Sequence, residues 1–295
     1  MIIVRLSGGM GNQMFQYAIG RKLSLKYGVE LKLDAFFLLD RTPRSTKRNL
    51  VFYDYALDVF NISAQIARRS EIPPIFRLYF FGKTRLLVDV IRRRFIFNPG
   101  KEKSFSFDER IFSIGPRAYI EGYWQSPKYF ADIEETLKKD FTLKTPLSHK
   151  AKVLFEQIQS HNSVCINVRR GDFVSSSFHG TFGLDYYQKG VNKIRESSPI
   201  DKIYIFSDDI EWCRNNLSFP FPFMIVGHEY AGSKFQEYLF LMSACKHFVI
   251  PNSTFAWWAA WLNTDRDKHV IVPKRWFLDD SINTNDLIPS GWIRI

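Results

Sequence analysis

From residue 147 to residue 272 the chain alternates helical segments with short apolar runs, and this alternation restricts the fold more than any other feature. The apolar runs read as buried strands at 163–168, 202–206, 223–226, 247–250 and 269–272. The helical segments lie at 147–160, 184–196, 234–244 and 254–263. Buried strands joined through helices form a parallel, doubly wound sheet. We therefore predict a Rossmann-like α/β domain over residues 151–278, followed by a tail, 279–295, that packs back on the N-terminal domain.

The start of the chain carries a unit of the same kind. Residues 2–6 predict a strand, residues 14–27 a helix and residues 29–34 a second strand. Gly28 lies where a glycine commonly ends a helix. This strand–helix–strand opening indicates a second parallel sheet, and we assign residues 1–150 to an N-terminal Rossmann-like domain.

The strand at 163–168 ends in the sequence Arg169-Arg170-Gly171-Asp172. A buried strand can carry such charges only at its end, where the backbone turns toward solvent or a ligand. Two adjacent guanidinium groups form a planar, permanently charged fork that suits a diphosphate. An arginine–aspartate pair that stabilises the turn explains the same residues. Because strand alternation separates Arg169 from Arg170, we predict that Arg169 faces the ligand and that Arg170 pairs with Asp172.

Polar segments follow other predicted strands as well. They are Gly8-Gly9-Met10-Gly11-Asn12-Gln13, Ser207-Asp208-Asp209 and Asn252-Ser253-Thr254. Ligands in such sheets bind outside the carboxyl ends of the strands, so all these segments converge on one kind of edge. The functional interpretation is a backbone anion site in the first, a carboxylate that reads guanine or ribose in the second, and phosphate-binding hydroxyls in the third. The simpler interpretation is a tight turn with a capping Asn in the first and helix N-caps in the other two.

A formal net charge of +11 favours polyanionic partners, namely nucleic acid, anionic lipid or a phosphorylated small molecule. Basic and aromatic residues are mixed between residues 68 and 103, including Arg92-Arg93-Arg94. Such a segment can lie on an anionic membrane or touch nucleic acid. A solvated helix whose aromatic residues face the core is the commoner explanation. We predict no nucleic-acid partner and keep a peripheral contact with anionic membrane as an open hypothesis.

Other patterns restrict the compartment and the chemistry. No run reaches the ~18 apolar residues of a membrane span, and the first residues already read as a strand, which leaves no room for a signal peptide. Three distant cysteines, Cys165, Cys213 and Cys245, fit a reduced compartment. We therefore expect a cytoplasmic protein, either free or peripheral on the inner face of the membrane. The histidines show no ligand spacing and Asp265-Arg266-Asp267 lies in a polar loop, so we predict no metal and no cofactor.

Taken together, the motifs resemble those of the α-1,2-fucosyltransferases, glycosyltransferase family 11. Residues 8–18 are similar to the opening motif of that family. Residues 169–172, 206–209 and 252–258 are similar to blocks that the family shares with α-1,6- and protein O-fucosyltransferases. The resemblance spans residues 1 to about 273, and its motifs occur in the expected order.

The resemblance implies a GT-B fold, in which two Rossmann-like domains with parallel sheets face each other across a cleft. It implies an inverting enzyme that moves L-fucose from GDP-L-fucose to the 2-hydroxyl of a terminal galactoside in a glycan, without a metal. The C-terminal domain would bind GDP-fucose, and the N-terminal domain would form the acceptor side. Donor-binding residues carried over by motif are Gly9, Gly11, Asn12, Asn167, Arg169, Asp208, Asp209, Ser253 and Thr254.

By the same resemblance, Arg169, Asp172 and Asn12 would act in catalysis. Arg169 would grip the β-phosphate, and Asp172 is the general-base candidate by position, although pairing with an arginine is the favoured role. The family block begins with His where this chain has Asn167, and a carboxamide cannot shuttle a proton near neutral pH. Two alternatives stay open: a fucosyltransferase of another linkage, since the shared blocks do not read the acceptor, and a non-catalytic binder of polyanions or membrane surfaces.

Overall fold

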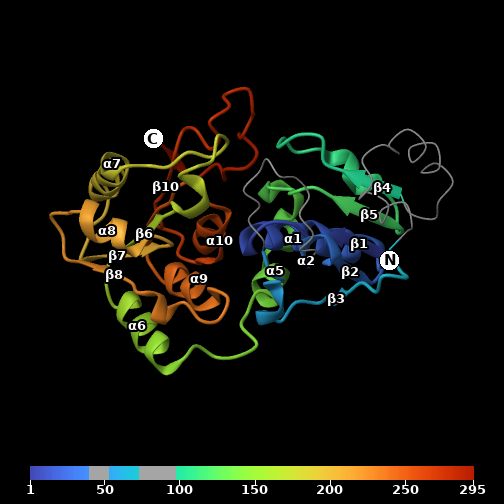
Figure 1. Ribbon diagram of the computed structural model, residues 1–295, viewed down its shortest axis with the longest axis horizontal. Helices are drawn as coiled ribbons and strands as arrows, with labels where there is room; N and C mark the ends of the chain where they lie inside the picture. Colours follow the sequence, from blue (N-terminus) through green and yellow to red (C-terminus); the bar gives the residue numbers. More distant parts are fainter. Residues whose placement is uncertain (40–52, 73–97) are drawn as a thin grey trace. The chain divides into compact units, whose positions relative to one another are not determined.

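The computed structural model describes residues 1–39, 53–72 and 98–295 and divides the chain into two compact units (Figure 1). Unit 1 comprises residues 1–142 and 285–287, and unit 2 comprises residues 143–284 and 288–295. The boundary placed at residue 150 from the sequence falls inside helix α6, His149–Gln159, whereas the structural division precedes that helix. Only the short segment 285–287 of the predicted tail groups with unit 1.

The described part of unit 1 is built on five parallel strands in the order β3-β2-β1-β5-β4. They are β1 (Ile2–Arg5), β2 (Leu31–Asp34), β3 (Gln65–Ile66), β4 (Asn98–Lys101) and β5 (Ala118–Glu121). The chain moves from β1 outward to β2 and β3, and then returns to the other side of β1. The strand order therefore reverses between β1 and β5, and such a reversal is where ligands bind in sheets of this type.

Helix α1, Met10–Tyr27, follows β1 and is buried along most of its length. It begins at Met10 rather than at Met14, because the glycine-rich segment supplies the first helical turn with Gly9 as N-cap. Gly28 ends the helix in the left-handed conformation, at φ 61°, which confirms the predicted stop. Gly20 allows the helix to approach the sheet, since a Cβ there would lie 2.5 Å from Val4 Cγ2. Among the described residues of this unit, the shorter helices are α2 (Phe36–Leu39) and α5 (Glu134–Asp140).

Unit 2 contains six parallel strands in the order β11-β10-β9-β6-β7-β8. They are β6 (Ser163–Val168), β7 (Lys202–Ser207), β8 (Phe223–Ile225), β9 (His247–Val249), β10 (Val270–Val272) and β11 (Ile293–Arg294). The strands predicted in this domain are confirmed. Strand β11 was not predicted, because its two residues pair at an edge and are too few to form a pattern. The order reverses between β6 and β9.

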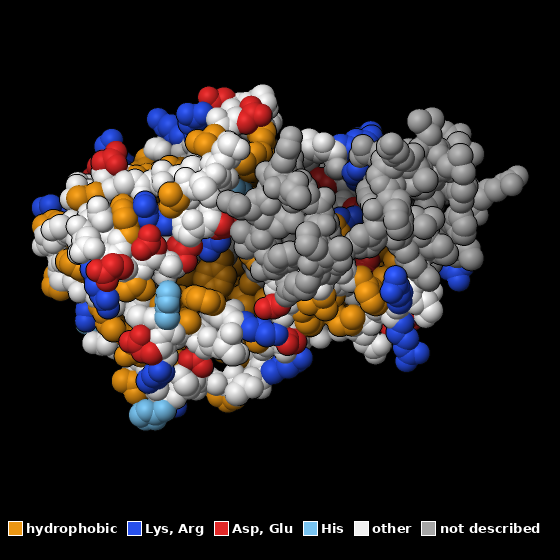
Figure 2. All heavy atoms as spheres, in the orientation of Figure 1, with side chains coloured by type: hydrophobic (Ala, Val, Ile, Leu, Met, Phe, Trp, Pro, Cys, Tyr) orange, Lys and Arg blue, Asp and Glu red, His pale blue; other side chains and the backbone are white. Residues whose placement is uncertain are grey.

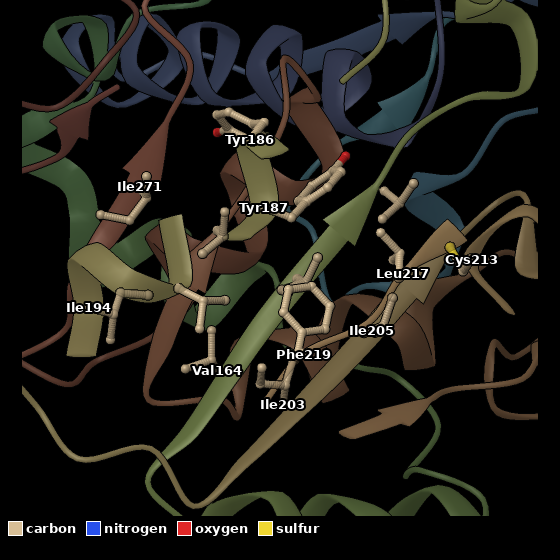
Figure 3. Packing of buried hydrophobic residues seen from close by; sticks show 14 residues of the cluster. Val164, Tyr186, Tyr187, Ile194, Ile203, Ile205, Cys213, Leu217, Phe219 and Ile271 are labelled. Carbon is tan, nitrogen blue, oxygen red and sulfur yellow. The ribbon is translucent and has the colours of Figure 1, made fainter. Parts of the chain in front are cut away.

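Helices cover both faces of the unit 2 sheet. They are α7 (Leu184–Arg195), α8 (Ile210–Asn216), α9 (Gln236–Ser243) and α10 (Thr254–Leu262), together with α6. Figure 3 shows Tyr187 and Ile194 of α7 packed with Val164 and Ile203 of the strands. On the other face the ring of Phe206 lies 5.4 Å from that of Tyr238 in α9. The central strands β6 and β9 are buried on both faces, as expected for strands covered by helices, and the α/β class with parallel sheets is confirmed.

Candidate active site

Three of the predicted segments lie at the carboxyl ends of adjacent strands in unit 2. Arg169 follows β6, Asp208 follows β7, and the segment 252–254 follows β9. The sheet order places β9, β6 and β7 side by side, with the reversal between β6 and β9. The fold therefore brings these sequence segments to one edge.

Arg169 is oriented by two carboxylates. Its Nη1 lies 3.0 Å from Asp208 Oδ2, and its Nη2 donates a hydrogen bond to Asp172 Oδ1. The predicted pair between Arg170 and Asp172 is wrong. Residues 171–173 form a single 3-10 turn, and this turn carries Asp172 back toward Arg169. The Arg169 side chain stays 31% exposed, which leaves part of the guanidinium open to a ligand.

Arg170 points to different partners. Its Nε donates to Asp209 Oδ2 at 3.2 Å, and its guanidinium lies 4.2 Å from the centre of the Trp212 ring. Asp209 Oδ1 accepts a hydrogen bond from Trp212 N at 3.0 Å and caps helix α8. The capping interpretation of Asp209 is therefore confirmed, and Arg170 has a structural role.

Asp208 connects the ends of β6 and β7. Its Oδ1 accepts a hydrogen bond from the backbone N–H of Arg170 at 2.9 Å, while Oδ2 faces Arg169. Gly171 leaves room for this approach, since a Cβ there would lie 2.6 Å from Asp208 Oδ2. Both oxygens of Asp208 thus have partners within the protein. A contact between guanine and Asp208 or Asp209 stays a prediction.

The segment after β9 forms the start of helix α10. Ser253 is the N-cap, and its Oγ accepts a hydrogen bond from Ala256 N at 3.4 Å, so its capping role is confirmed. Asn252 is buried and donates from Nδ2 to the carbonyl oxygens of His179, at 2.7 Å, and Trp276, at 3.0 Å. Backbone N–H groups in a first helical turn lack intrahelical partners. Ser253 and Thr254 therefore remain candidates for holding a phosphate.

Buried polar atoms without partners gather beside these strand ends. Asn167 Oδ1, Asn252 Oδ1 and His179 Nδ1 have no hydrogen-bond partner among the described residues. Each such atom is unfavourable by about 1–3 kcal/mol, which indicates a place where a ligand or water supplies partners. Asn167 itself is anchored by a hydrogen bond from Nδ2 to the Phe206 carbonyl at 3.2 Å.

His179 was not singled out from the sequence, because a lone histidine carries no local signal. Its ring stacks on that of Phe173, with centroids 4.1 Å apart. Burial lowers the pKa of the imidazole, while the nearby Asp172 raises it and Arg169 lowers it more weakly. A neutral imidazole therefore lies next to the Arg169–Asp172 pair at neutral pH.

The glycine-rich candidates belong to unit 1. Gly9 is the N-cap of α1, and Gly11 and Asn12 lie in its first turn rather than in a preceding loop. Asn12 does not cap the helix, which corrects the simpler interpretation of this segment. Its Oδ1 accepts a hydrogen bond from Gln125 Nε2 at 2.9 Å, and Gln125 follows β5. This contact spans the reversal between β1 and β5.

Most of the basic and aromatic stretch 68–103 lies outside the described residues, so its contact with a membrane stays a prediction. On the face drawn in Figure 2, the blue and red side chains are interspersed over the described surface. Within the described ranges, no group of His, Cys, Asp and Glu is arranged to hold a metal ion, and no helix is long and apolar enough to cross a membrane.

Comparisons with known proteins bear on this arrangement. Residues 102–295 match the model of Glycosyl transferase family 11. The α-1,2-colitosyltransferase of Escherichia coli is 31% identical over 100% of this chain and 99% of its own length. The E. coli O-antigen biosynthesis glycosyltransferase WbnK is 29% identical over 98% of this chain and 99% of its length. The fucosyltransferase NodZ from Bradyrhizobium has a TM-score of 0.50 at 15% identity, covering 88% of this chain and 90% of NodZ, and this similarity supports the GT-B class of fold.

Proposed function

Since the chain belongs to glycosyl transferase family 11, we propose that it is an inverting galactoside α-1,2-fucosyltransferase that uses GDP-L-fucose. The acceptor would be a terminal galactoside of a glycan, and the name of its relative WbnK makes O-antigen glycans the first candidates. The reaction would need no metal. A cytoplasmic location, peripheral to the inner face of the membrane, belongs to the same proposal.

The observation that carries the proposal is the oriented guanidinium of Arg169 at the carboxyl end of β6. In the reaction, the acceptor oxygen forms a bond to the anomeric carbon of fucose. The bond from that carbon to the diphosphate breaks, and its electron pair leaves with GDP. A fixed cation at the leaving diphosphate stabilises this developing charge, together with the N-terminus of α10 at Ser253 and Thr254.

The proton of the acceptor hydroxyl needs a base. Asp172 remains the candidate chosen by position, although its Oδ1 already accepts a hydrogen bond from Arg169. Asn167 cannot take this role, since a carboxamide does not titrate near neutral pH. His179 is neutral and adjacent, which makes it a second candidate in this unit.

Incubation with labelled GDP-L-fucose and a panel of β-galactosides, followed by linkage analysis of the product, tests the proposal. We expect fucose on the galactose 2-hydroxyl, with full activity in a metal chelator. Fucose on another hydroxyl would point to a different linkage. If no galactoside gives either fucose transfer or GDP release, the proposal is refuted.

One observation favours GDP-colitose as an alternative donor. The relative that matches the full length of this chain is named an α-1,2-colitosyltransferase. Colitose is a 3-deoxy analogue of fucose, so the two donors differ by one hydroxyl. A site built to bind that hydroxyl would reject the deoxy sugar strongly, whereas an apolar site would discriminate weakly. Competition between GDP-fucose and GDP-colitose in one reaction measures this preference directly.

A further inference from the structure

A pocket of about 190 Å³ opens in unit 1 at the carboxyl ends of β4 and β5. Glu102 follows β4 directly, and Trp124 lies in the segment that follows β5. The pocket is smaller than the roughly 300 Å³ at which sites for drug-sized ligands begin. Its size therefore suits a single ring-sized group rather than a nucleotide.

Glu102 is held at the pocket wall by backbone hydrogen bonds. Its Oε2 accepts from Tyr123 N at 2.7 Å, and its Oε1 accepts from Trp124 N at 2.9 Å. Each carboxylate oxygen keeps further acceptor capacity for a hydroxyl group. Burial raises the pKa of this carboxyl to about 7, although the two N–H donors oppose the shift. The group is thus both fixed and incompletely solvated.

Trp124 adopts a backbone conformation that is rare for a bulky residue. Its φ is 55°, in the left-handed region, and such strain is concentrated at functional sites. The side chain is 2% exposed, and its Nε1 has no hydrogen-bond partner among the described residues. A Cβ on Gly122 would lie 2.9 Å from Trp124 Nε1 and 2.8 Å from Glu102 Oε2. Since this Cβ would also lie 2.4 Å from Glu102 Cβ, only glycine lets the Glu102 and Trp124 side chains pack this closely at the pocket wall.

Aromatic rings complete the wall. The ring centroid of Tyr129 lies 4.9 Å from that of Phe107 and 5.3 Å from that of Trp124. Flat apolar rings combined with a few fixed polar groups are the usual lining of a small-molecule site. The next residue, Gln125, donates to Asn12 Oδ1 at 2.9 Å, so the segment that carries Trp124 also contacts the first turn of α1.

We propose that this pocket holds one sugar unit of the acceptor glycan, with Glu102 accepting from one sugar hydroxyl and Trp124 Nε1 donating to another. The inference rests on the proposed function and adds the residues that would bind the acceptor sugar. None of them belongs to the motifs that resemble the fucosyltransferase family.

Trp124→Phe tests the proposal most sharply, because it removes the indole N–H while keeping an aromatic ring and the same backbone requirement. We expect the KM for lactose or N-acetyllactosamine to rise about 2- to 10-fold, with an unchanged KM for GDP-fucose. Trp292→Phe in unit 2 is the matched control. Ser106→Leu, which fills the pocket from its wall, is a second variant that should raise the acceptor KM further. Unchanged acceptor KM values in both folded pocket variants would overturn the proposal.

Failure of the inference and failure of the proposed function give different results. If wild-type protein transfers no sugar, the proposed function fails, and saturation-transfer NMR with the same disaccharides still tests the pocket. Saccharide signals that are present with wild type and weakened in Trp124→Phe would support the pocket. Signals that are equal with both proteins, or absent with wild type, would overturn it.

Discussion

Replacing Arg169 with lysine keeps the positive charge and removes the fork. In the structure the guanidinium contacts Asp208 through Nη1, at 3.0 Å, and Asp172 through Nη2. A lysine ammonium is a compact point charge on a flexible stem and cannot hold both carboxylates and a phosphate in the same fixed plane. We therefore expect at least one charge-assisted hydrogen bond to the leaving diphosphate to be lost.

A hydrogen bond to a charged group contributes about 1.5–3 kcal/mol. Because about 1.4 kcal/mol corresponds to a tenfold change in rate, kcat/KM for GDP-fucose should fall roughly 10- to 150-fold in Arg169→Lys. Steady-state kinetics measures the loss, and calorimetric titration with GDP separates weakened binding from slowed chemistry. Arg195→Lys, on the exposed side of α7, is the matched control and should leave both quantities unchanged.

A folded Arg169→Lys protein whose kcat/KM lies within a factor of two of wild type would refute this role of the guanidinium. Such a result would remove the guanidinium from the donor site, whatever its contacts in the free protein. Thermal unfolding should accompany the kinetics, since a large drop in Tm would indicate that the lost ion pairs stabilise the fold instead.

Three further predictions concern stability. Gly20→Ala should lower the free energy of unfolding by about 1–3 kcal/mol, because its methyl group overlaps Val4, whereas Gly291→Ala has open space and should be neutral in the same denaturant titration. Asp209→Ala removes the N-cap of α8 and should lower the free energy of unfolding by about 0.5–2 kcal/mol, which a thermal melt detects as a lower Tm. An unchanged Tm would contradict the capping role of Asp209. The folded-state pKa of Glu102 is raised from 4.5 to about 7. The protonated carboxyl therefore contributes its full share to the free energy of unfolding below pH 4.5, and this contribution is lost as the pH rises to about 7. Across that window the Tm of wild type should fall relative to Glu102→Gln, and parallel pH curves would show that the carboxyl does not titrate this way.

Strands β6, β7, β9 and β10 of unit 2 could be predicted from sequence because they are almost wholly buried and largely apolar. Strand β4 could not, since Pro99 and Gly100 are atypical strand residues. The start of α1 was placed too late because three glycines obscure a helical turn whose stability comes from packing. Local sequence patterns thus predict elements whose residues favour that structure by themselves. They miss elements that depend on tertiary packing.

The residues of the candidate site also fall into those that the sequence predicts and those that it does not. Arg169, Asp208 and Ser253 were predicted because the carboxyl ends of parallel strands meet at one edge. The partner of Asp172 was predicted wrongly, since strand alternation stops where the 3-10 turn begins. His179 and Glu102 were missed because what distinguishes them is burial and the loss of hydration, which no short sequence pattern encodes.

The ion pairs around Arg169 have a consequence for how a donor arrives. Two guanidinium groups there face three carboxylates, Asp172, Asp208 and Asp209, which leaves a formal charge of −1 before any ligand binds. A diphosphate that binds as proposed brings further negative charge and competes with these aspartates for the partly exposed Arg169 guanidinium. Nucleotide binding in the proposed site would in this sense be a competition between anions for one cation.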